Sequence, residues 1–403
     1  MNCQICSSNE MIKFLDLGYH PPPLNFVNAN GKGTEQKKFS LQVFFCNSCG
    51  LVQLGEAIDP NLMFKEYVYT SGVSTAFKEH LRSFTDLLVK RFGLTTRDLA
   101  IDIASNDGTL LEGFVKHDVK VLGVEPSNVA KIAIEKGIHT INEFFNEDTA
   151  KKILRESGQA KIITAANVFA HVDRLDSMMK GIKLLLKDDG AYVSESQYLK
   201  DIIEKLEYDT IYHEHLRYYT LTQLIRLFEK YEMEVFDAER ISAQGGSIRV
   251  YASHKGKMAI SDSVHRILKD EKDSKIASLE TLQNFARRVE KNKQDLRSLL
   301  KELKSQGKRI VGISAPARSS TILNYCEIGP QDLEYVTEKS NLKIGKLTPG
   351  THIPVVEDER LVQDQPDYAL LLSWHLKDSI IPKIRKDGYR GKFIIPLPDV
   401  EII

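Results

Sequence analysis

The sequence predicts an α/β protein, because short apolar runs typical of buried parallel strands alternate with segments of helical periodicity. The first apolar run, residues 99–103, leads into a polar turn at 104–108 that opens a helix. A second run at 119–124 ends in Glu125. The pattern starts again at residues 310–313. These observations predict two α/β units, each built on a largely parallel sheet.

Length and charge limit the classes of function. A chain of 403 residues favours two or three domains. Lys+Arg and Asp+Glu are both 55, and this balance argues against a general binder of nucleic acid or membrane surfaces. No run reaches the roughly 18–20 apolar residues of a membrane span, and no apolar signal segment opens the chain. We therefore expect a cytoplasmic protein with no nucleic-acid or membrane partner.

Four of the five cysteines form two C-x-x-C pairs, Cys3 with Cys6 and Cys46 with Cys49. In a large cytoplasmic chain such pairs indicate a metal rather than disulfides. Two knuckles that each point two thiolates inward complete a tetrahedral site suited to zinc. Four thiolates leave no open position for a substrate, so we expect a structural zinc ion in a lobe formed by residues 1–70.

The turn after the first strand indicates which cofactor this unit binds. A nicotinamide site would show three glycines here, but only Gly108 is present, so the turn suits a nucleoside without a pyrophosphate, such as S-adenosylmethionine. Glu125, at the tip of the second strand, is placed to accept hydrogen bonds from both ribose hydroxyls. The candidate cofactor-binding residues are Asp102, Ala104, Asn106, Asp107, Gly108, Glu125, Pro126, Phe144 and Asn167.

The stretch Asp209–Tyr219 crowds histidines, acids and tyrosines together, which is what proton abstraction next to a carbonyl needs. His213 and His215 flank Glu214 and would share one face of an extended segment, so a metal site or a polar loop are open alternatives. The H-E-x-x-H spacing of a helical zinc protease site is absent.

The second α/β unit carries small and hydroxyl residues where a helix begins after its first strand, and Arg318 adds a charged fork. Such a helix N-terminus is a ready site for an anion, and a pyrophosphate is the predicted guest. His352 and His375, each taken alone, favour a structural role. The candidate substrate-binding residues are Ser314, Ala315, Arg318, Ser319, Glu338, His352, Trp374 and His375.

Seven motifs occur in register along the chain. They are C-x-x-C…C-x-x-C-G, Y-V-Y-T-S-G, D-I-A-S-N-D-G-T-L-L, V-E-P-S, A-N-V-F-A-H-V, Y-H-E-H and S-A-P-A-R-S-S-T-I-L-N-Y. Together they resemble the sugar C-methyltransferase family of deoxysugar pathways over essentially the full chain. The resemblance implies a zinc-binding lobe at 1–70, a Rossmann-like S-adenosylmethionine-dependent methyltransferase domain at 71–256, a helical connector at 257–306 and a C-terminal α/β nucleotide-sugar-binding domain at 307–403. The implied reaction is methylation at C3 of a nucleotide-linked 4-keto-deoxysugar.

The same resemblance implies roles for individual residues. The implied catalytic residues are Tyr67 or Tyr69 of Y-V-Y-T-S-G, His171 of A-N-V-F-A-H, and Tyr212, Glu214 and His215 of Y-H-E-H. We expect His215 to be the general base and Tyr212 to donate a hydrogen bond to the developing enolate. We expect Glu214 to orient an imidazole.

Departures from the family pattern concern the substrate more than the reaction. The C-terminal motif reads A-P-A-R-S-S where many members carry a lysine-glycine pair, S-W-H replaces A-W-N, and Ala104 stands where glycine is common. The alternatives are methyl transfer to oxygen or nitrogen of a small polar substrate, and an inactive zinc-containing binding protein. The expected partner is the keto-sugar nucleotide, bound by a monomer or weak homo-oligomer.

Overall fold

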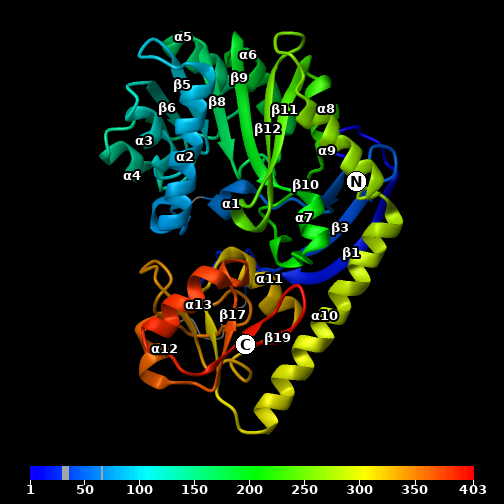
Figure 1. Ribbon diagram of the computed structural model, residues 1–403, viewed down its shortest axis with the longest axis vertical. Coiled ribbons are helices and arrows are strands. Elements are labelled where there is room, and N and C mark those ends of the chain that lie inside the picture. The colour runs from blue at the N-terminus through cyan, green and yellow to red at the C-terminus, as the bar shows by residue number, and fades with distance from the viewer. Residues whose placement is uncertain (30–35, 65–66) are drawn as a thin grey trace.

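The computed structural model describes residues 1–29, 36–64 and 67–403. The molecule is elongated, with a seven-stranded sheet in its upper half, a six-stranded sheet in its lower half and one long helix running down the side (Figure 1). The α/β class predicted from the sequence is confirmed. Of the helices in these residues, none combines the length and the apolarity needed to cross a bilayer.

The seven-stranded sheet has the order β11-β12-β9-β8-β5-β6-β7. Its strands are β5 (Leu99–Ile103), β6 (Lys120–Val124), β7 (Thr140–Ile141), β8 (Ala160–Ala166), β9 (Leu186–Gln197), β11 (Met233–Ile241) and β12 (Ser247–His254). The first five run parallel, and β11 and β12 close the sheet as an antiparallel pair. The polar residues at the start of β9 look like a loop in the sequence, but they are already extended in the structure.

Helices cover both faces of this sheet, which explains why all five residues of β5 are buried. One face packs against α2 (Thr75–Phe92) and α3 (Thr109–Val115). The other packs against helices that include α5 (Glu147–Ser157), α6 (Leu175–Leu185) and α8 (Leu221–Glu229). The shorter α4 (Ala130–Glu135) follows β6, and α9 (Asp262–Asp273) contacts α8 and β11.

The N-terminal sheet takes one strand from the middle of the chain. Its order is β1 (Met11–His20), β3 (Phe39–Cys46), β4 (Val52–Leu54) and β10 (Arg217–Tyr218), all antiparallel. The pairing of β4 with β10 joins this sheet to the residues directly after Y-H-E-H. The short α1 (Pro60–Phe64) follows, and β2 (Val27–Asn28) pairs with β15 (Lys346–Leu347).

The lower sheet has the order β16-β14-β13-β17-β18-β19 and is parallel except for its last strand. The strands are β13 (Ile310–Ile313), β14 (Val336–Glu338), β16 (Val355–Glu357), β17 (Tyr368–Leu371), β18 (Lys392–Ile395) and β19 (Glu401–Ile402); the helices are α11 (Ala317–Tyr325), α12 (Glu359–Asp364) and α13 (Lys377–Lys386). The chain order reverses at β13, which lies between β14 and β17. Ligands of open α/β sheets bind at such a switch point.

The two halves share one apolar core. α10 (Leu279–Ser305) buries a stripe that includes Leu282, Val289 and Leu296, spaced seven residues apart, as two helical turns require. These side chains belong to one cluster with residues of β1 and β3, of α7 (Leu199–Glu204), of the 3₁₀ turn Tyr208–Thr210 and of the lower sheet. Burial of this shared surface holds the halves together.

Candidate active site

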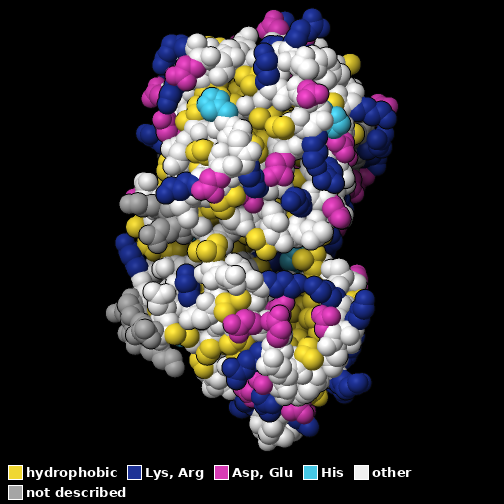
Figure 2. Space-filling model, turned by 90° about the vertical axis from the view of Figure 1, so that its left-hand side faces the viewer, with side chains coloured by type: hydrophobic (Ala, Val, Ile, Leu, Met, Phe, Trp, Pro, Cys, Tyr) yellow, Lys and Arg dark blue, Asp and Glu magenta, His cyan; other side chains and the backbone are white. Residues whose placement is uncertain are grey.

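A cavity of about 1040 Å³ lies between the two halves. In the view of Figure 2, hydrophobic side chains gather along the boundary between the upper and lower halves. Seventeen of the predicted residues line it: Tyr67, Tyr69, Asp102, Ala104, Asn106, Glu125, Pro126, Phe144, Asn167, His171, Tyr212, Glu214, His215, Ser314, Arg318, Glu338 and His375. The fold therefore brings the predicted cofactor, catalytic and substrate residues to one place.

His215 is held as a neutral imidazole of one tautomer. Its Nδ1 lies 2.6 Å from the carbonyl oxygen of Thr210. A carbonyl only accepts, so Nδ1 carries the hydrogen and Nε2 keeps its lone pair. Burial, and then the neighbouring His171, hold the pKa of His215 well below its usual value. The Tyr212 ring is 4.0 Å away, centroid to centroid. An imidazole whose Nε2 carries no hydrogen and lies in a cavity is the form that a general base needs.

Glu214 contacts a tyrosine and not an imidazole. The hydroxyl of Tyr67 donates to its Oε2 at 3.1 Å. Burial raises the pKa of Glu214 to about 7, and the hydrogen bond from Tyr67 acts in the opposite direction. We expected Glu214 to orient an imidazole, but the hydrogen bond that orients His215 comes from Thr210. Of the two tyrosines between which the sequence did not decide, Tyr67 contacts the Y-H-E-H stretch, although Tyr69 also lines the cavity.

His213 and His215 do not share a face. Residues 212–215 form a turn, in which the amide of His215 donates to the carbonyl of Tyr212 at 2.9 Å. His213 donates instead to the carbonyl of Phe39 at 3.2 Å and does not line the cavity. In the described part of the chain, the four cysteines are the only group of three or more potential metal ligands. The metal-site alternative for this stretch therefore has no support.

The turn at residues 104–108, which we call the cofactor turn, contains three residues with left-handed backbone. Ala104, Asn106 and Gly108 have φ values of 54°, 52° and 77°. Glu125 stabilises the turn, because its Oε2 accepts from the amide of Asn106 at 2.9 Å. The side-chain nitrogen of Asn167 is buried and has no hydrogen-bond partner among the described residues. An unused buried donor and a strand-tip carboxylate that line the same cavity fit a polar nucleoside ligand, which would give the Asn167 amide its partner.

Asp107 and Gly108 do not line the cavity. Asp107 accepts at Oδ1 from the Thr109 hydroxyl at 2.6 Å and at Oδ2 from the amide of Gly72 at 2.8 Å. Next to it, the side-chain oxygen of Asn106 accepts from the amide of Ser71 at 2.9 Å. The role of Asp107 in this structure is thus to fasten the tyrosine segment onto the cofactor turn.

The lower edge of the cavity differs most from expectation. Arg318, the predicted pyrophosphate fork, uses Nε and Nη2 to bind the two carboxylate oxygens of Asp209, at 2.6 and 2.7 Å. Lys343, which the sequence reasoning missed, lines the cavity and donates to Glu338 at 3.1 Å and to the carbonyl of Ala315 at 2.9 Å. A single lysine in a lysine-rich chain carries no sequence signal of its position.

Four predicted substrate residues lie outside the cavity. Ala315, Ser319, His352 and Trp374 do not line it. The hydroxyl of Ser319 donates to the carbonyl of Pro316 at 2.7 Å, and the indole of Trp374 donates to Asp209 at 2.8 Å. His352 follows β15, which pairs with β2 of the N-terminal part.

Three lining residues near the cofactor end were also missed. His80 forms a 2.7 Å contact with Glu195, Phe77 stacks on His80, and Phe64 stacks on His171. They belong to helices α2 and α1, where aromatic and histidine residues look like ordinary packing. Only contacts between distant segments distinguish them.

The four predicted zinc ligands meet. The Sγ atoms of Cys3, Cys6, Cys46 and Cys49 all lie within 4.8 Å of one another. Four thiolates at this spacing suit zinc. α8 supports the second knuckle: Gln223 and Arg226 donate to the carbonyl of Cys49 at 3.1 and 2.9 Å.

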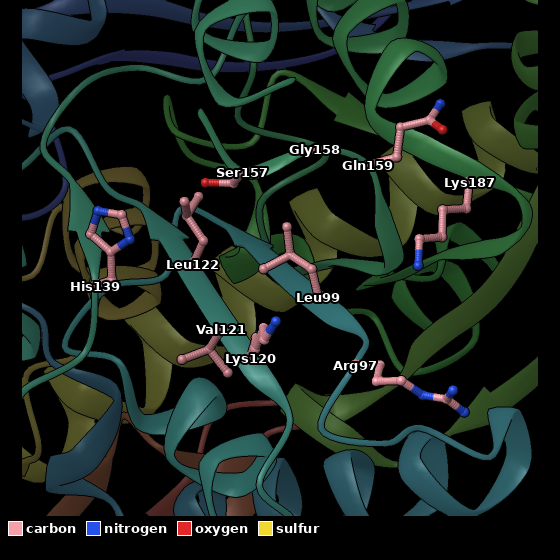
Figure 3. Close-up of a pocket in the computed structure, with 10 residues that line it drawn as sticks. All are labelled: Arg97, Leu99, Lys120, Val121, Leu122, His139, Ser157, Gly158, Gln159 and Lys187. Atoms are coloured by element: carbon pink, nitrogen blue, oxygen red, sulfur yellow. The ribbon is translucent and has the colours of Figure 1, made fainter. Parts of the chain in front are cut away.

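A smaller cavity of about 550 Å³ lies at the opposite, amino-terminal edge of the seven-stranded sheet (Figure 3). Its lining includes Leu99 and Lys120, the first residues of β5 and β6, together with Arg97, His139 and Lys187. None of the predicted site residues lines it.

Comparisons with known proteins match three segments of the chain. Family models match residues 3–64 (putative zinc binding domain), 77–237 (methyltransferase domain) and 242–398 (C-methyltransferase C-terminal domain). The chain is 31% identical over 410 residues to the C-methyltransferase NovU of Streptomyces niveus, covering all of this chain and 96% of that protein.

Two further similarities are partial. A putative methyltransferase of Dictyostelium discoideum is 32% identical over 119 residues, which are 30% of this chain and 44% of that protein. The crystal structure of the PH0226 protein of Pyrococcus horikoshii matches with a TM-score of 0.38 and 15% identity, covering 47% of this chain and 95% of that one. We draw nothing further from a likeness this low.

Proposed function

The chain belongs to the C-methyltransferase family, and on that premise we propose that it methylates C3 of a nucleotide-linked 4-keto-deoxysugar with His215 as general base. It is an S-adenosylmethionine-dependent methyltransferase, and a structural zinc ion is its second cofactor. The observation that carries the proposal is the bare Nε2 of His215 in the same cavity as the cofactor turn.

His215 removes a proton from carbon in this proposal. A ketone at C4 makes the hydrogen on C3 acidic, and a neutral imidazole with a free Nε2 accepts it. Because Thr210 fixes the other ring nitrogen as a donor, the imidazole needs no tautomer change before each turnover. Phe64 and Phe77 line the same cavity, and such apolar walls would reduce the contact of the carbanion with water.

Tyr212 stabilises the enolate. Burial and the nearby Glu214 raise the pKa of Tyr212 well above its usual value, so the phenol keeps its proton and can donate a hydrogen bond to the developing oxyanion. Glu214 holds the hydroxyl of Tyr67 on the same side of the cavity. In this proposal Tyr67 serves as a second phenol in the same cavity.

Glu125, Asn106 and Asn167 would hold S-adenosylmethionine, which supplies an electrophilic methyl group. The Glu125 carboxylate suits the ribose hydroxyls, and Asn167 offers its unpaired amide. At the opposite wall, Ser314, directly after β13, and Lys343, in the turn that follows β14, line the cavity. A lysine beside a switch point of a parallel sheet suits the diphosphate of a nucleotide sugar.

The test begins with a panel of nucleoside-diphosphate-linked 4-keto-deoxysugars, incubated with the enzyme and S-adenosylmethionine and analysed by mass spectrometry. We expect a gain of one methylene, and in deuterated water without the methyl donor we expect deuterium to enter C3. His215→Asn should abolish both, while calorimetry still detects binding of S-adenosylmethionine.

His213→Asn is the matched control, because His213 is a buried histidine two positions away that does not line the cavity. It should retain both exchange and methylation. Methylation or exchange that survives in His215→Asn would remove His215 from the proposed role. Methylation without any exchange at carbon in the wild type would point to transfer to oxygen or nitrogen.

A further inference from the structure

We propose that the lower half of the molecule positions the catalytic base: Arg318, Trp374 and Thr321 hold the 3₁₀ turn Tyr208–Thr210 so that the Thr210 carbonyl meets Nδ1 of His215. The inference rests on the proposed role of His215. It assigns Asp209, Arg318, Trp374 and Thr321 as positioning residues.

Asp209 is the centre of this arrangement. Its side chain is fully buried, and three hydrogen bonds from the lower half reach it. Arg318 on α11 donates to Oδ2 at 2.6 Å and to Oδ1 at 2.7 Å, and the Trp374 indole donates to Oδ2 at 2.8 Å. Two donors of the guanidinium plane on two carboxylate oxygens fix orientation as well as distance. Asp209 therefore has one position relative to α11.

The residues on both sides of Thr210 are fixed as well. The hydroxyl of Thr321, one turn along α11 from Arg318, donates to the carbonyl of Ile211 at 2.8 Å. The hydroxyl of Tyr208 donates to Asn292 of α10 at 3.0 Å. The long helix and the lower half therefore determine the positions of the residues around Thr210. Thr210 itself contacts His215 through its carbonyl and not through its side chain.

The connection to the base runs through one carbonyl. Thr210 ends the 3₁₀ turn, with Asp209 before it and Ile211 directly after it, so its carbonyl direction follows from theirs. That carbonyl makes the 2.6 Å contact with Nδ1 of His215. Without it the hydrogen can move to Nε2, which would then be a donor and no longer a base.

A purely structural purpose would not require an ion pair. Apolar side chains of similar volume would fill this interior at least as favourably, since the desolvation of a buried pair offsets much of its attraction. The bidentate geometry instead gives a defined direction, which a base needs for a near-attack arrangement. The charge pair also joins two segments, at 209 and 318, that are 109 positions apart in the chain.

Two mild variants test the inference. Trp374→Phe keeps an aromatic ring but removes the indole donor, and Thr321→Val keeps the branched shape but removes the hydroxyl. In protein labelled with ¹⁵N-histidine, we expect the wild type to show His215 as the Nδ1–H tautomer, with its signals assigned by their absence in His215→Asn. Each variant should give a mixture of tautomers and a kcat lower by about ten- to a hundred-fold, with the affinity for S-adenosylmethionine unchanged by calorimetry.

Tyr389→Phe is the control, because it removes a hydroxyl elsewhere in the lower half, one that donates to the carbonyls of Pro366 at 3.1 Å and Lys392 at 3.3 Å. It should change neither the tautomer nor kcat. Folding is checked by thermal unfolding, and if Trp374→Phe does not fold, Thr321→Val decides. An unchanged His215 tautomer in a folded variant would overturn the inference. Full turnover in His215→Asn would instead overturn the proposed function, while an altered tautomer in the other variants would still show the positioning.

Discussion

Burial sets the protonation state of the side chains around the cavity. It lowers the pKa of His171 to about 4 and, as the largest cause, holds the pKa of His215 well below its usual value, so both imidazoles are neutral at neutral pH. It raises the pKa of Tyr67 and Tyr212, so both phenols stay protonated. The carboxyls of Glu214 and Asp102 are the exceptions, since burial raises the pKa of each to about 7, within the working range of an enzyme.

The raised pKa of Glu214 predicts how the stability of the protein depends on pH. Its pKa rises from 4.5 in the unfolded chain to about 7 in the folded protein, so between these values the folded state binds more protons. The free energy of unfolding must therefore fall as pH rises through this window, by about 3 kcal/mol in total. Glu214→Gln lacks this dependence. Urea unfolding of both proteins at pH 5 and pH 8 should show Glu214→Gln gaining stability over the wild type as pH rises.

If the difference in free energy of unfolding between the two proteins is the same at pH 5 and pH 8, the raised pKa of Glu214 is contradicted. Tyr67→Phe supplies a second check, because the Tyr67 hydroxyl lowers the pKa of Glu214. Without this hydroxyl the pKa of Glu214 should rise, so the infrared band of the protonated carboxyl should persist to a higher pH.

At the scale of elements, the segment Tyr67–Val73 is fastened to the loop that follows β5. The amides of Ser71 and Gly72 donate to the side chains of Asn106 and Asp107. The same segment delivers Tyr67 to Glu214. The cofactor turn and Tyr67, a proposed catalytic residue, thus share one support, so we expect a change at the turn to alter the position of the Tyr67 hydroxyl.

Gly72→Ala tests this support. A Cβ at Gly72 would lie 2.8 Å from Oδ2 of Asp107 and 3.1 Å from Oγ1 of Thr109, so the amide–carboxylate hydrogen bond must lengthen or break. We expect the affinity for S-adenosylmethionine to fall about ten-fold, equivalent to the loss of one charge-assisted hydrogen bond. Calorimetry measures it. Ser71→Ala, which keeps both backbone donors, should bind normally, and wild-type affinity in Gly72→Ala would disprove the coupling.

At the scale of the whole molecule, the parts named from the sequence share their interiors. One apolar cluster joins β1, β3, α10 and the lower sheet, and another joins the zinc knuckles to α6 and α8. The division at residues 70, 256 and 306 stays a prediction, because it does not follow gaps in the core. The zinc lobe also reaches the site directly, since β4 pairs with β10 two residues after His215.

Loss of zinc should therefore affect catalysis as well as stability. Cys46→Ser removes one of four thiolates, and we expect metal analysis to find no zinc and the melting temperature to fall by several degrees. Turnover should fall at temperatures where the protein is still folded, because β10 loses its partner strand. Cys326→Ser is the control, since Cys326 is buried outside the zinc set. A zinc-free protein with wild-type turnover would show that the lobe is independent of the site.

The sequence by itself determined the parts whose signal is local. The strand–turn–helix at 99–111, the acid at Glu125 and the paired cysteines each place their chemistry within a few residues, so pattern and spacing suffice. Most of the predicted residues line the cavity for the same reason: parallel strands deliver their tips to one edge.

Tertiary structure alone decided which partner each of these groups meets. Asp209 and Arg318 are 109 positions apart. The sequence gives no sign that the Arg318 guanidinium binds this carboxylate instead of being free for a pyrophosphate. The tautomer of His215 likewise depends on the direction of one carbonyl, that of Thr210. Residue type specifies which hydrogen bonds a side chain can form, but only the folded chain determines which of them it has already formed.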